Sequence, residues 1–174
     1  MQPTQLSPSS TFTPEFSPSP SQSDLPSLDA EIERIIAQSG GTWHIVIKEV
    51  DGETLYARDS ESRINIASLV KVPLALLFFQ VLEANGIPEE QLREYLSATG
   101  TGGRTFEQLV RAMLVQSEED ATQILDAYIR QSALNLPAQM RAWGLEMLDL
   151  EARRYTAARV ADIFERLYLG DFVS

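Results

Sequence analysis

The sequence has no cysteine and only one histidine, His44. Without thiols the chain cannot form disulfides, use a thiol nucleophile or build a zinc site of the usual Cys/His type. His44 follows Trp43 and has no acidic or serine partner nearby in sequence, so a Ser-His-Asp triad is not indicated. We interpret this histidine as structural.

Positive charge is also scarce. The chain carries 14 Lys and Arg against 25 Asp and Glu, a formal net charge of -11. This balance argues against a protein that binds phosphate backbones, so nucleic acid is not an expected partner. The 174 residues are 44% hydrophobic, which fits one globular domain with a core rather than a disordered or fibrous chain.

Long hydrophobic runs are few. The N-terminus has neither the basic nor the apolar segment of a signal peptide. The longest apolar run lies between Lys71 and Glu83 and contains Pro73 and Gln80, so it is shorter than the roughly 20 residues that a membrane helix needs. We therefore expect a buried core helix there and no membrane insertion by this chain.

The first 27 residues, MQPTQLSPSSTFTPEFSPSPSQSDLPS, are dominated by Pro, Ser and Thr and contain no Lys or Arg. Such a composition buries too little apolar surface to fold, so residues 1–27 are predicted to be a disordered tether. A spacer of this kind commonly separates a membrane or lipid anchor from an extracytoplasmic domain, and a plain disordered tail has the same composition. The first interpretation predicts a periplasmic or cell-surface location.

From residue 28 the pattern becomes that of a folded domain, which we place at 28–174. A helical apolar spacing begins at Leu28 and closes at the glycine pair 40–41. The stretches TWHIVIKEV and TLYARD, joined by DGE, predict two strands with a tight Asp51-Gly52 turn. A lone hairpin is marginal in water, and we expect a helix over 65–84 to cover it.

The second half of the sequence has a mostly helical pattern. Thr105 and Gln108 form a capping-box pattern before an amphipathic run, and two further apolar stripes predict helices around 121–129 and 160–168. There is no internal repeat. The order of helix, hairpin, buried helix and helical region predicts the α+β class.

Lys71 stands inside the apolar stretch NIASLVKVPLALLFF, where an unpaired ammonium group would be costly. Ser68 lies three residues earlier, so on a helix the two side chains share a face. Burial favours a neutral amine that takes the serine proton, while N–H groups at the helix start face a developing oxyanion. Pro73 predicts an irregular first turn and a helix start close to Ser68. The alternative is a chance S-x-x-K spacing, with Ser68 as a cap and Lys71 reaching solvent.

The segment HIVIKEVDGETLYARDSESRINIASLVKVPLALLFFQVLE, with TFEQLVRAMLVQSEEDATQIL after it, resembles the penicillin-recognising serine enzymes, specifically the class A β-lactamases and their relatives. The first segment is similar to that family's opening hairpin and S-x-x-K helix, and the second to the helix before its S-D-N loop. AWGL and YTAARVADIFERLYLG are similar to the family's subsequent segments. The resemblance covers residues 28–172 and implies a β-lactamase/transpeptidase-like fold and a serine hydrolase without metal or cofactor.

The resemblance also implies roles by position. Ser68 would be the acylated nucleophile, with its backbone N–H as one oxyanion donor, and Lys71 would be its base partner. Ser117 would match the serine of S-D-N, which passes a proton toward the leaving nitrogen. Because S-E-E-D is also a capping pattern with Asp120 at its third helical position, we expect Ser117 to be a helix cap as well.

Three departures from the family pattern change the expected activity. Glu119 stands where the family has Asn, and a carboxylate there would hold Lys71 in its charged form unless it is protonated or faces solvent. The segment LEMLDLEARRYT contains no E-x-x-L-N glutamate to activate a deacylating water, and Glu146 and Glu151 need no catalytic explanation. No K-T-G occurs before the sequence ends at LGDFVS. We therefore expect slow or absent deacylation, and a chain that is the N-terminal part of a domain whose C-terminal strands are missing.

Three interpretations stay open. The first is a β-lactamase-like serine acyl enzyme, impaired in this chain, that acts on β-lactams or on D-Ala-D-Ala-type peptides of the peptidoglycan kind. The second is a non-catalytic β-lactamase-like module that binds ligands in its cleft or at its exposed edge. The third is an unrelated helical scaffold, which predicts that Lys71 is exposed to solvent.

Overall fold

The computed structural model describes residues 27–172, so the predicted tether lies outside the described residues apart from Ser27. The chain divides into two units, one ending at Gly40 and the other beginning at residue 41. The first unit contains helix α1 (Leu28–Ser39), which begins where the Ser27 hydroxyl accepts a hydrogen bond from the backbone N–H of Ala30. Gly40 ends the helix with φ +65°, so the helix predicted from residue 28 to the glycine pair is confirmed.

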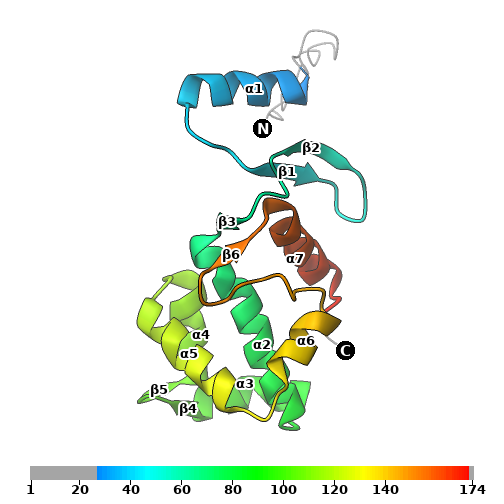
Figure 1. The fold of residues 1–174 in the computed structure, drawn as a ribbon. Helices are drawn as coiled ribbons and strands as arrows, with labels where there is room; N and C mark the ends of the chain where they lie inside the picture. Colours follow the sequence, from blue (N-terminus) through cyan, green and yellow to red (C-terminus); the bar gives the residue numbers. More distant parts are fainter. Residues whose placement is uncertain (1–26, 173–174) are drawn as a thin grey trace, which may run out of the picture. The chain divides into compact units, whose positions relative to one another are not determined.

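The second unit opens with the predicted hairpin, whose strands are β1 (Ile45–Lys48) and β2 (Thr54–Arg58) (Figure 1). They pair antiparallel, and the register shifts between Ile47 and Lys48. The turn differs from the prediction in detail, because the Gly52 N–H donates to the Glu49 carbonyl at 3.2 Å. Asp51 rather than Gly52 takes the left-handed conformation, with φ +54°, since the bulge moves the turn back by one residue.

Helix α7 (Ala157–Leu169) packs along strand β1 of this hairpin. Lys48 forms ion pairs with Glu165 and Asp162, at 2.5 Å and 3.4 Å. The second carboxylate oxygen of Glu165 accepts from the Asp51 N–H at 2.8 Å, so one side chain fixes both the strand and its turn. The expectation that the 65–84 segment covers the hairpin was therefore wrong. Helix α7 packs on the hairpin instead, and the ion pairs of Lys48 hold it there.

The apolar segment that carries Lys71 forms the central helix of this unit. A 3-10 turn, Ala67–Val70, leads directly into α2 (Lys71–Ala84), which confirms the predicted irregular first turn. Pro73 is tolerated because the first N–H groups of a helix lack intrahelical partners. Among the described residues Ala67–Ala84 alone is long and apolar enough to cross a membrane, but half of it is buried inside the domain, as in a soluble core helix.

The other helices of this unit surround α2. In Figure 1, α2 runs between α4 and α5 on one side and α6 on the other. The Thr105 hydroxyl and the Gln108 amide cap the start of α4 reciprocally, so the predicted capping box is confirmed. The remaining elements are α3 (Glu89–Ala98), β4 (Gly100–Thr101), β5 (Arg104–Thr105), α4 (Phe106–Val115), α5 (Glu119–Gln131), α6 (Leu136–Ala142), and the antiparallel pair β3 (Ile64–Asn65) and β6 (Arg154–Tyr155).

The core is built around buried side chains of α2. The ring of Phe78 is fully buried and lies 5.1 Å from that of Phe106 and 5.9 Å from that of Tyr128, measured between centroids. Such tilted aromatic contacts fix the orientation of neighbouring helices. The described residues form a mostly helical structure with three two-stranded ladders, which is compatible with the predicted α+β class.

Candidate active site

Ser68 lies in the 3-10 turn, directly after a strained residue. Ala67 has φ +47°, a left-handed conformation that costs a non-glycine residue about 1 kcal/mol or more. Two hydrogen bonds hold the backbone there: the Ala67 N–H donates to Asn65 Oδ1 at 2.7 Å, and the Ile66 N–H donates to the Arg153 carbonyl at 2.8 Å. The strand pair β3 and β6 anchors the same segment, so the chain just before Ser68 is fixed in place.

Lys71 is buried, with 3% of its surface exposed, and its described hydrogen bonds converge on one loop residue. Its Nζ donates to the Ser117 carbonyl at 2.6 Å and to Ser117 Oγ at 3.0 Å. Ser117 Oγ in turn donates to Ser68 Oγ at 2.9 Å. A continuous hydrogen-bond chain thus runs from the buried amine through Ser117 to the exposed Ser68 hydroxyl. The burial of Lys71 contradicts the unrelated-scaffold interpretation, which required an exposed lysine.

Ser117 stands in the loop between α4 and α5 and does not cap a helix. Helix α5 begins at Glu119 and its N-cap position is Glu118, with no side-chain capping bond, so the predicted cap was wrong. The S-E-E-D pattern fails because Ser117 takes φ +56° and turns its hydroxyl toward Lys71 and Ser68 instead. The pattern predicted the N-cap at Ser117, whereas the N-cap position is the next residue, Glu118.

The short ladder of β4 and β5 steadies this loop. Arg104 binds Glu118 at 2.6 Å, and the Glu118 N–H donates to the Ala112 carbonyl at 3.0 Å. Gly100 is required for the ladder, because a Cβ at this position would clash with the Arg104 carbonyl oxygen. The conformation of Ser117 is therefore supported by residues on both sides of it.

Glu119 lies between two cations. One carboxylate oxygen is 3.5 Å from Lys71 Nζ, and the other accepts a hydrogen bond from the Arg153 guanidinium. The hydrogen bond from Arg153 is the largest cause that lowers the pKa of Glu119, and the charges of Arg153 and Lys71 lower it further. Glu119 is therefore ionised at neutral pH, and of the alternatives left open by the sequence, pairing with Lys71 is the one observed.

Arg153 is the residue that sequence reasoning missed. It belongs to the segment LEMLDLEARRYT, which offered no recognisable motif, and it lies 34 residues from its partner Glu119 in sequence. Its only signal is the pair of adjacent arginines, Arg153 and Arg154, in a strongly acidic chain. Such a pair does not reveal which acidic residue it will meet.

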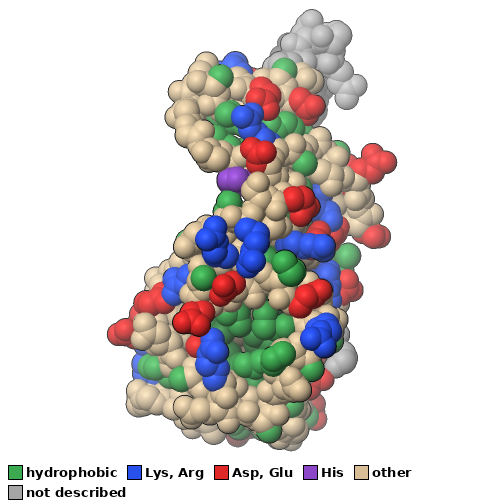
Figure 2. All heavy atoms as spheres, in the orientation of Figure 1, with side chains coloured by type: hydrophobic (Ala, Val, Ile, Leu, Met, Phe, Trp, Pro, Cys, Tyr) green, Lys and Arg blue, Asp and Glu red, His purple; other side chains and the backbone are tan. Residues whose placement is uncertain are grey.

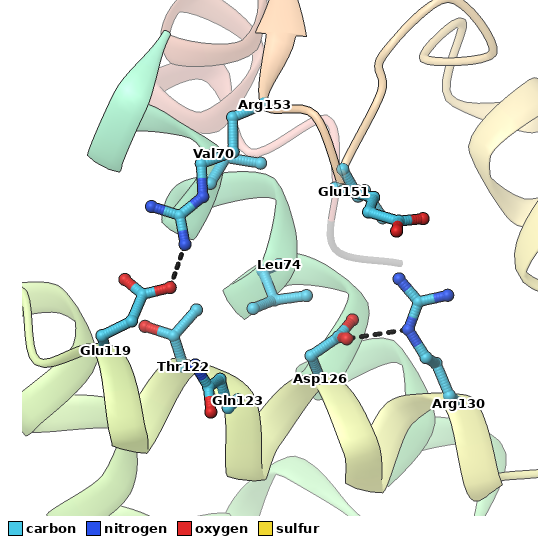
Figure 3. A pocket seen from close by; sticks show the side chains of 10 residues that line it. Val70, Leu74, Glu119, Thr122, Gln123, Asp126, Arg130, Glu151 and Arg153 are labelled. Carbon is cyan, nitrogen blue, oxygen red and sulfur yellow. Dashed lines mark hydrogen bonds and ion pairs between the residues drawn. The ribbon is translucent and has the colours of Figure 1, made fainter. Parts of the chain in front are cut away.

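Two cavities flank the start of α2. One, of about 350 Å³, is lined by the polar groups of Ser68, Lys71 and Ser117 and by the apolar side chains of Ile66, Ala67, Leu69, Val72, Met113 and Leu114. The other, of about 480 Å³, lies on the side of Glu119 and Arg153, with Val70 and Leu74 beneath it (Figure 3). Figure 2 shows apolar surface in the helical part ringed by charged side chains. The first cavity gives a small molecule access to the Ser68 hydroxyl.

The model of the beta-lactamase enzyme family matches residues 27–174. Because this match covers most of the chain, the protein belongs to that family, and the predicted resemblance is confirmed. At the family level it is a β-lactamase-like hydrolase, and the family suggests small-molecule β-lactams as substrates. No curated protein sequence matches the chain. All four residues singled out from the sequence, Ser68, Lys71, Ser117 and Glu119, lie together at the start of α2.

Proposed function

We propose that the protein is a serine acyl enzyme in which Ser68 attacks β-lactams or D-Ala-D-Ala-type peptides. The observation that carries the proposal is the hydrogen-bond chain from buried Lys71 through Ser117 to exposed Ser68. A lone serine is a weak nucleophile, and it needs an adjacent group that removes its proton. The same contacts supply such a path within ordinary hydrogen-bond distances, once Lys71 is neutral and the two hydroxyls turn so that Ser68 donates to Ser117 and Ser117 donates to Lys71.

In the proposed acylation, Ser68 Oγ forms a bond to the amide carbonyl carbon while its proton passes to the neutral amine of Lys71, through the Ser117 hydroxyl. The C–N bond then breaks as Ser117 delivers a proton to the leaving nitrogen and is reprotonated from Lys71. The Ser68 backbone N–H stands at the start of a helix, where it can donate to the developing oxyanion. The products are an ester of Ser68 and a free amine.

The cavity beside Ser68 supports a small acyl donor with apolar substituents. Six of the nine lining residues are apolar, and Lys71 is the one charged side chain among them. Apolar walls with a few polar groups are typical of small-molecule sites. Penicillins with an aromatic side chain are therefore suitable probes of this site.

We further propose that deacylation is slow. Glu119, the carboxylate in contact with Lys71, has one oxygen engaged with Arg153 and the other with Lys71, so it is poorly suited to activate a water molecule. Glu151 lines the other cavity, on the side of Arg130 and Arg153. An acyl group on Ser68 would therefore persist, which is the behaviour of a penicillin-binding relative rather than of an efficient β-lactamase.

The ion pair between Lys71 and Glu119 favours a second candidate, a non-catalytic binding module. An ammonium group held at 3.5 Å from a carboxylate is a poor base. In this case a β-lactam binds in the Ser68 cavity without a covalent bond. Covalent labelling of Ser68 distinguishes the two candidates.

The experiment is labelling with a fluorescent penicillin, read on a denaturing gel. We expect the parent chain to be labelled and Ser68→Ala to be unlabelled. Ser97→Ala is the matched control, since Ser97 is an exposed serine on α3 whose hydroxyl donates to the Glu94 carbonyl, and it should label like the parent. Reversible binding of penicillin to an unlabelled but folded parent would favour the binding module.

We also propose an extracytoplasmic location, because the family's proposed substrates are cell-wall peptides and their β-lactam mimics, and residues 1–27 have the composition of a tether. Protease added to spheroplasts of cells that express the protein, with the outer membrane opened and the inner membrane intact, should degrade it. Protection until the inner membrane is lysed would contradict this location.

A further inference from the structure

Glu119 is shared unequally between its two cations. Its hydrogen bond with Arg153 is direct, whereas Lys71 Nζ lies 3.5 Å from the other oxygen. The three side chains also differ in exposure, which is 4% for Lys71, 44% for Glu119 and 31% for Arg153. Figure 3 shows Arg153 reaching across to the Glu119 carboxylate from the segment before β6. The carboxylate thus stands at the boundary between the buried amine and solvent.

Glu119 and Arg153 have opposite effects on the balance between the charged and the neutral form of Lys71. A carboxylate near a buried amine favours the charged ammonium form, because opposite charges attract more strongly where water is excluded. Arg153 opposes this in two ways: it takes up part of the carboxylate's charge, and its own positive charge disfavours a second cation nearby. Both effects of Arg153 act in the same direction, toward the neutral amine.

Other charged groups around the site are already paired. Glu118 binds Arg104, and Asp126 binds Arg130 at 2.7 Å within the larger cavity, with Glu151 beside Arg130. The cavity on the Ser68 side contains Lys71 as its one charged lining residue. Glu119 is therefore the carboxylate that contacts Lys71 among the described residues, and Arg153 is the cation that shares it.

The backbone holds Arg153 in position for this task. Its carbonyl accepts from the Ile66 N–H at 2.8 Å, and the next residue, Arg154, pairs with Asn65 across β3 and β6. Arg153 itself has φ +54°, a conformation that a non-glycine residue adopts only when its surroundings impose it. The same strand pair that fixes the chain before Ser68 thus presents the guanidinium to Glu119.

We propose that Arg153 is a positioning residue that keeps Glu119 from locking Lys71 in its charged form, so that Lys71 can act as a base. This inference rests on the proposed role of Lys71 in the acylation of Ser68. It explains how a chain with Glu at position 119, where the related enzymes have Asn, retains a usable lysine. Loss of Arg153 should be harmful only while Glu119 is present.

The direct test observes Lys71 itself. The chain has only two lysines, Lys48 and Lys71, so protein labelled with 13C at lysine Cε gives two side-chain NMR signals, which Lys48→Arg assigns. We expect Arg153→Gln to raise the pH midpoint of the Lys71 signal by about one unit, because the variant removes a nearby like charge and leaves Glu119 to pair with Lys71 alone. The double variant Arg153→Gln with Glu119→Gln should cancel this rise. Arg154→Gln, the same charge change one residue away, should leave the midpoint unmoved.

The pH dependence of acylation gives the second readout. In Arg153→Gln the acid limb of the acylation rate should move to higher pH with a loss of roughly tenfold at neutral pH, and Glu119→Gln should restore it. An unchanged Lys71 midpoint in Arg153→Gln, or the same rise in the double variant, would overturn the inference. Failure of the proposed function looks different: the parent would show no acylation at any pH, while the NMR comparison would still report on Arg153.

Discussion

The hydroxyl of Ser117 lies between the buried amine of Lys71 and the exposed hydroxyl of Ser68, the proposed nucleophile. It is 3.0 Å from Lys71 Nζ and 2.9 Å from Ser68 Oγ, while the Ser117 carbonyl holds Lys71 independently at 2.6 Å. Removal of the hydroxyl therefore interrupts the proton path without leaving the buried amine unpartnered. The carbonyl of Ser117 therefore holds Lys71 in place, whereas its hydroxyl is the group that we propose transfers protons.

We predict that Ser117→Ala and Ser117→Gly slow acylation by about 10²-fold to 10⁴-fold, the usual contribution of general acid-base groups. Glycine suits the φ of +56° at this position, so Ser117→Gly should unfold no earlier than Ser117→Ala. Acylation rates and thermal unfolding of both variants check this. Parent-like acylation in either folded variant would remove Ser117 from the proton path.

The sequence pattern predicts which candidate site residues belong together but not all of their contacts. Ser68, Lys71, Ser117 and Glu119 were found because the S-x-x-K and S-E-E-D motifs keep their order in the chain. Arg153 was missed because an ion pair over 34 residues leaves no periodicity or spacing to detect. The predicted cap at Ser117 failed because tertiary contacts with Lys71 outweighed a local capping preference.

At the scale of elements, Glu165 on α7 links the last helix to the hairpin. This carboxylate binds Lys48 on β1 and the backbone N–H of Asp51 in the turn. Both contacts lower the pKa of Glu165 from its ordinary value of 4.5, the hydrogen bond from Lys48 most of all. A carboxyl group whose pKa is lowered on folding stabilises the fold above that ordinary value and loses this effect as the pH falls through the lowered pKa.

We therefore predict that Glu165→Gln lowers the free energy of unfolding at neutral pH and that the difference from the parent disappears in acid, well below pH 4.5. Urea unfolding of parent and variant at both pH values measures this. Glu61→Gln, an exposed change in the loop after β2, serves as the control and should have little effect at either pH. A difference that persists unchanged in acid would show that the ion pair is not its source.

The aromatic cluster joins α2 to its neighbouring helices. Phe78 is fully buried and contacts the rings of Phe106 and Tyr128. Phe78→Ala should cost about 3–5 kcal/mol of unfolding free energy, because it removes a large side chain and leaves a cavity. Tyr168→Ala on α7 is the control, since Tyr168 is 78% exposed, and it should cost about 0.5 kcal/mol or less. Equal costs for the two changes in urea unfolding would contradict the observed core.

The elements were more predictable than their packing. The capping box at Thr105, the irregular start of the helix before Pro73 and the two strands of the hairpin all arise from local chemistry and were confirmed. The helix that covers the hairpin was not predictable, because the partners of Lys48 lie more than a hundred residues further along the chain. Local patterns define an element, whereas long-range ion pairs decide where it packs.

At the scale of the whole molecule, the most apolar helix is explained by its burial in a domain of the beta-lactamase enzyme family. Its length and composition alone would also fit a membrane span, but its buried side chains contact α4 and α5 rather than facing outward. Lys71 in its first turn is buried and hydrogen-bonded to Ser117. The proposed role in the acylation of Ser68 would account for a lysine inside an apolar run.

The measurement that tests the central claim most directly is peptide mapping by mass spectrometry after incubation of the folded chain with a penicillin. Trypsin should release residues 64–71, INIASLVK, in which Ser68 is the only serine, while Ser117 falls in the separate peptide 112–130. We predict one ring-opened penicillin on residues 64–71, persisting for hours and absent from Ser68→Ala. A folded chain that carries no adduct, or carries it on another peptide, would contradict the account.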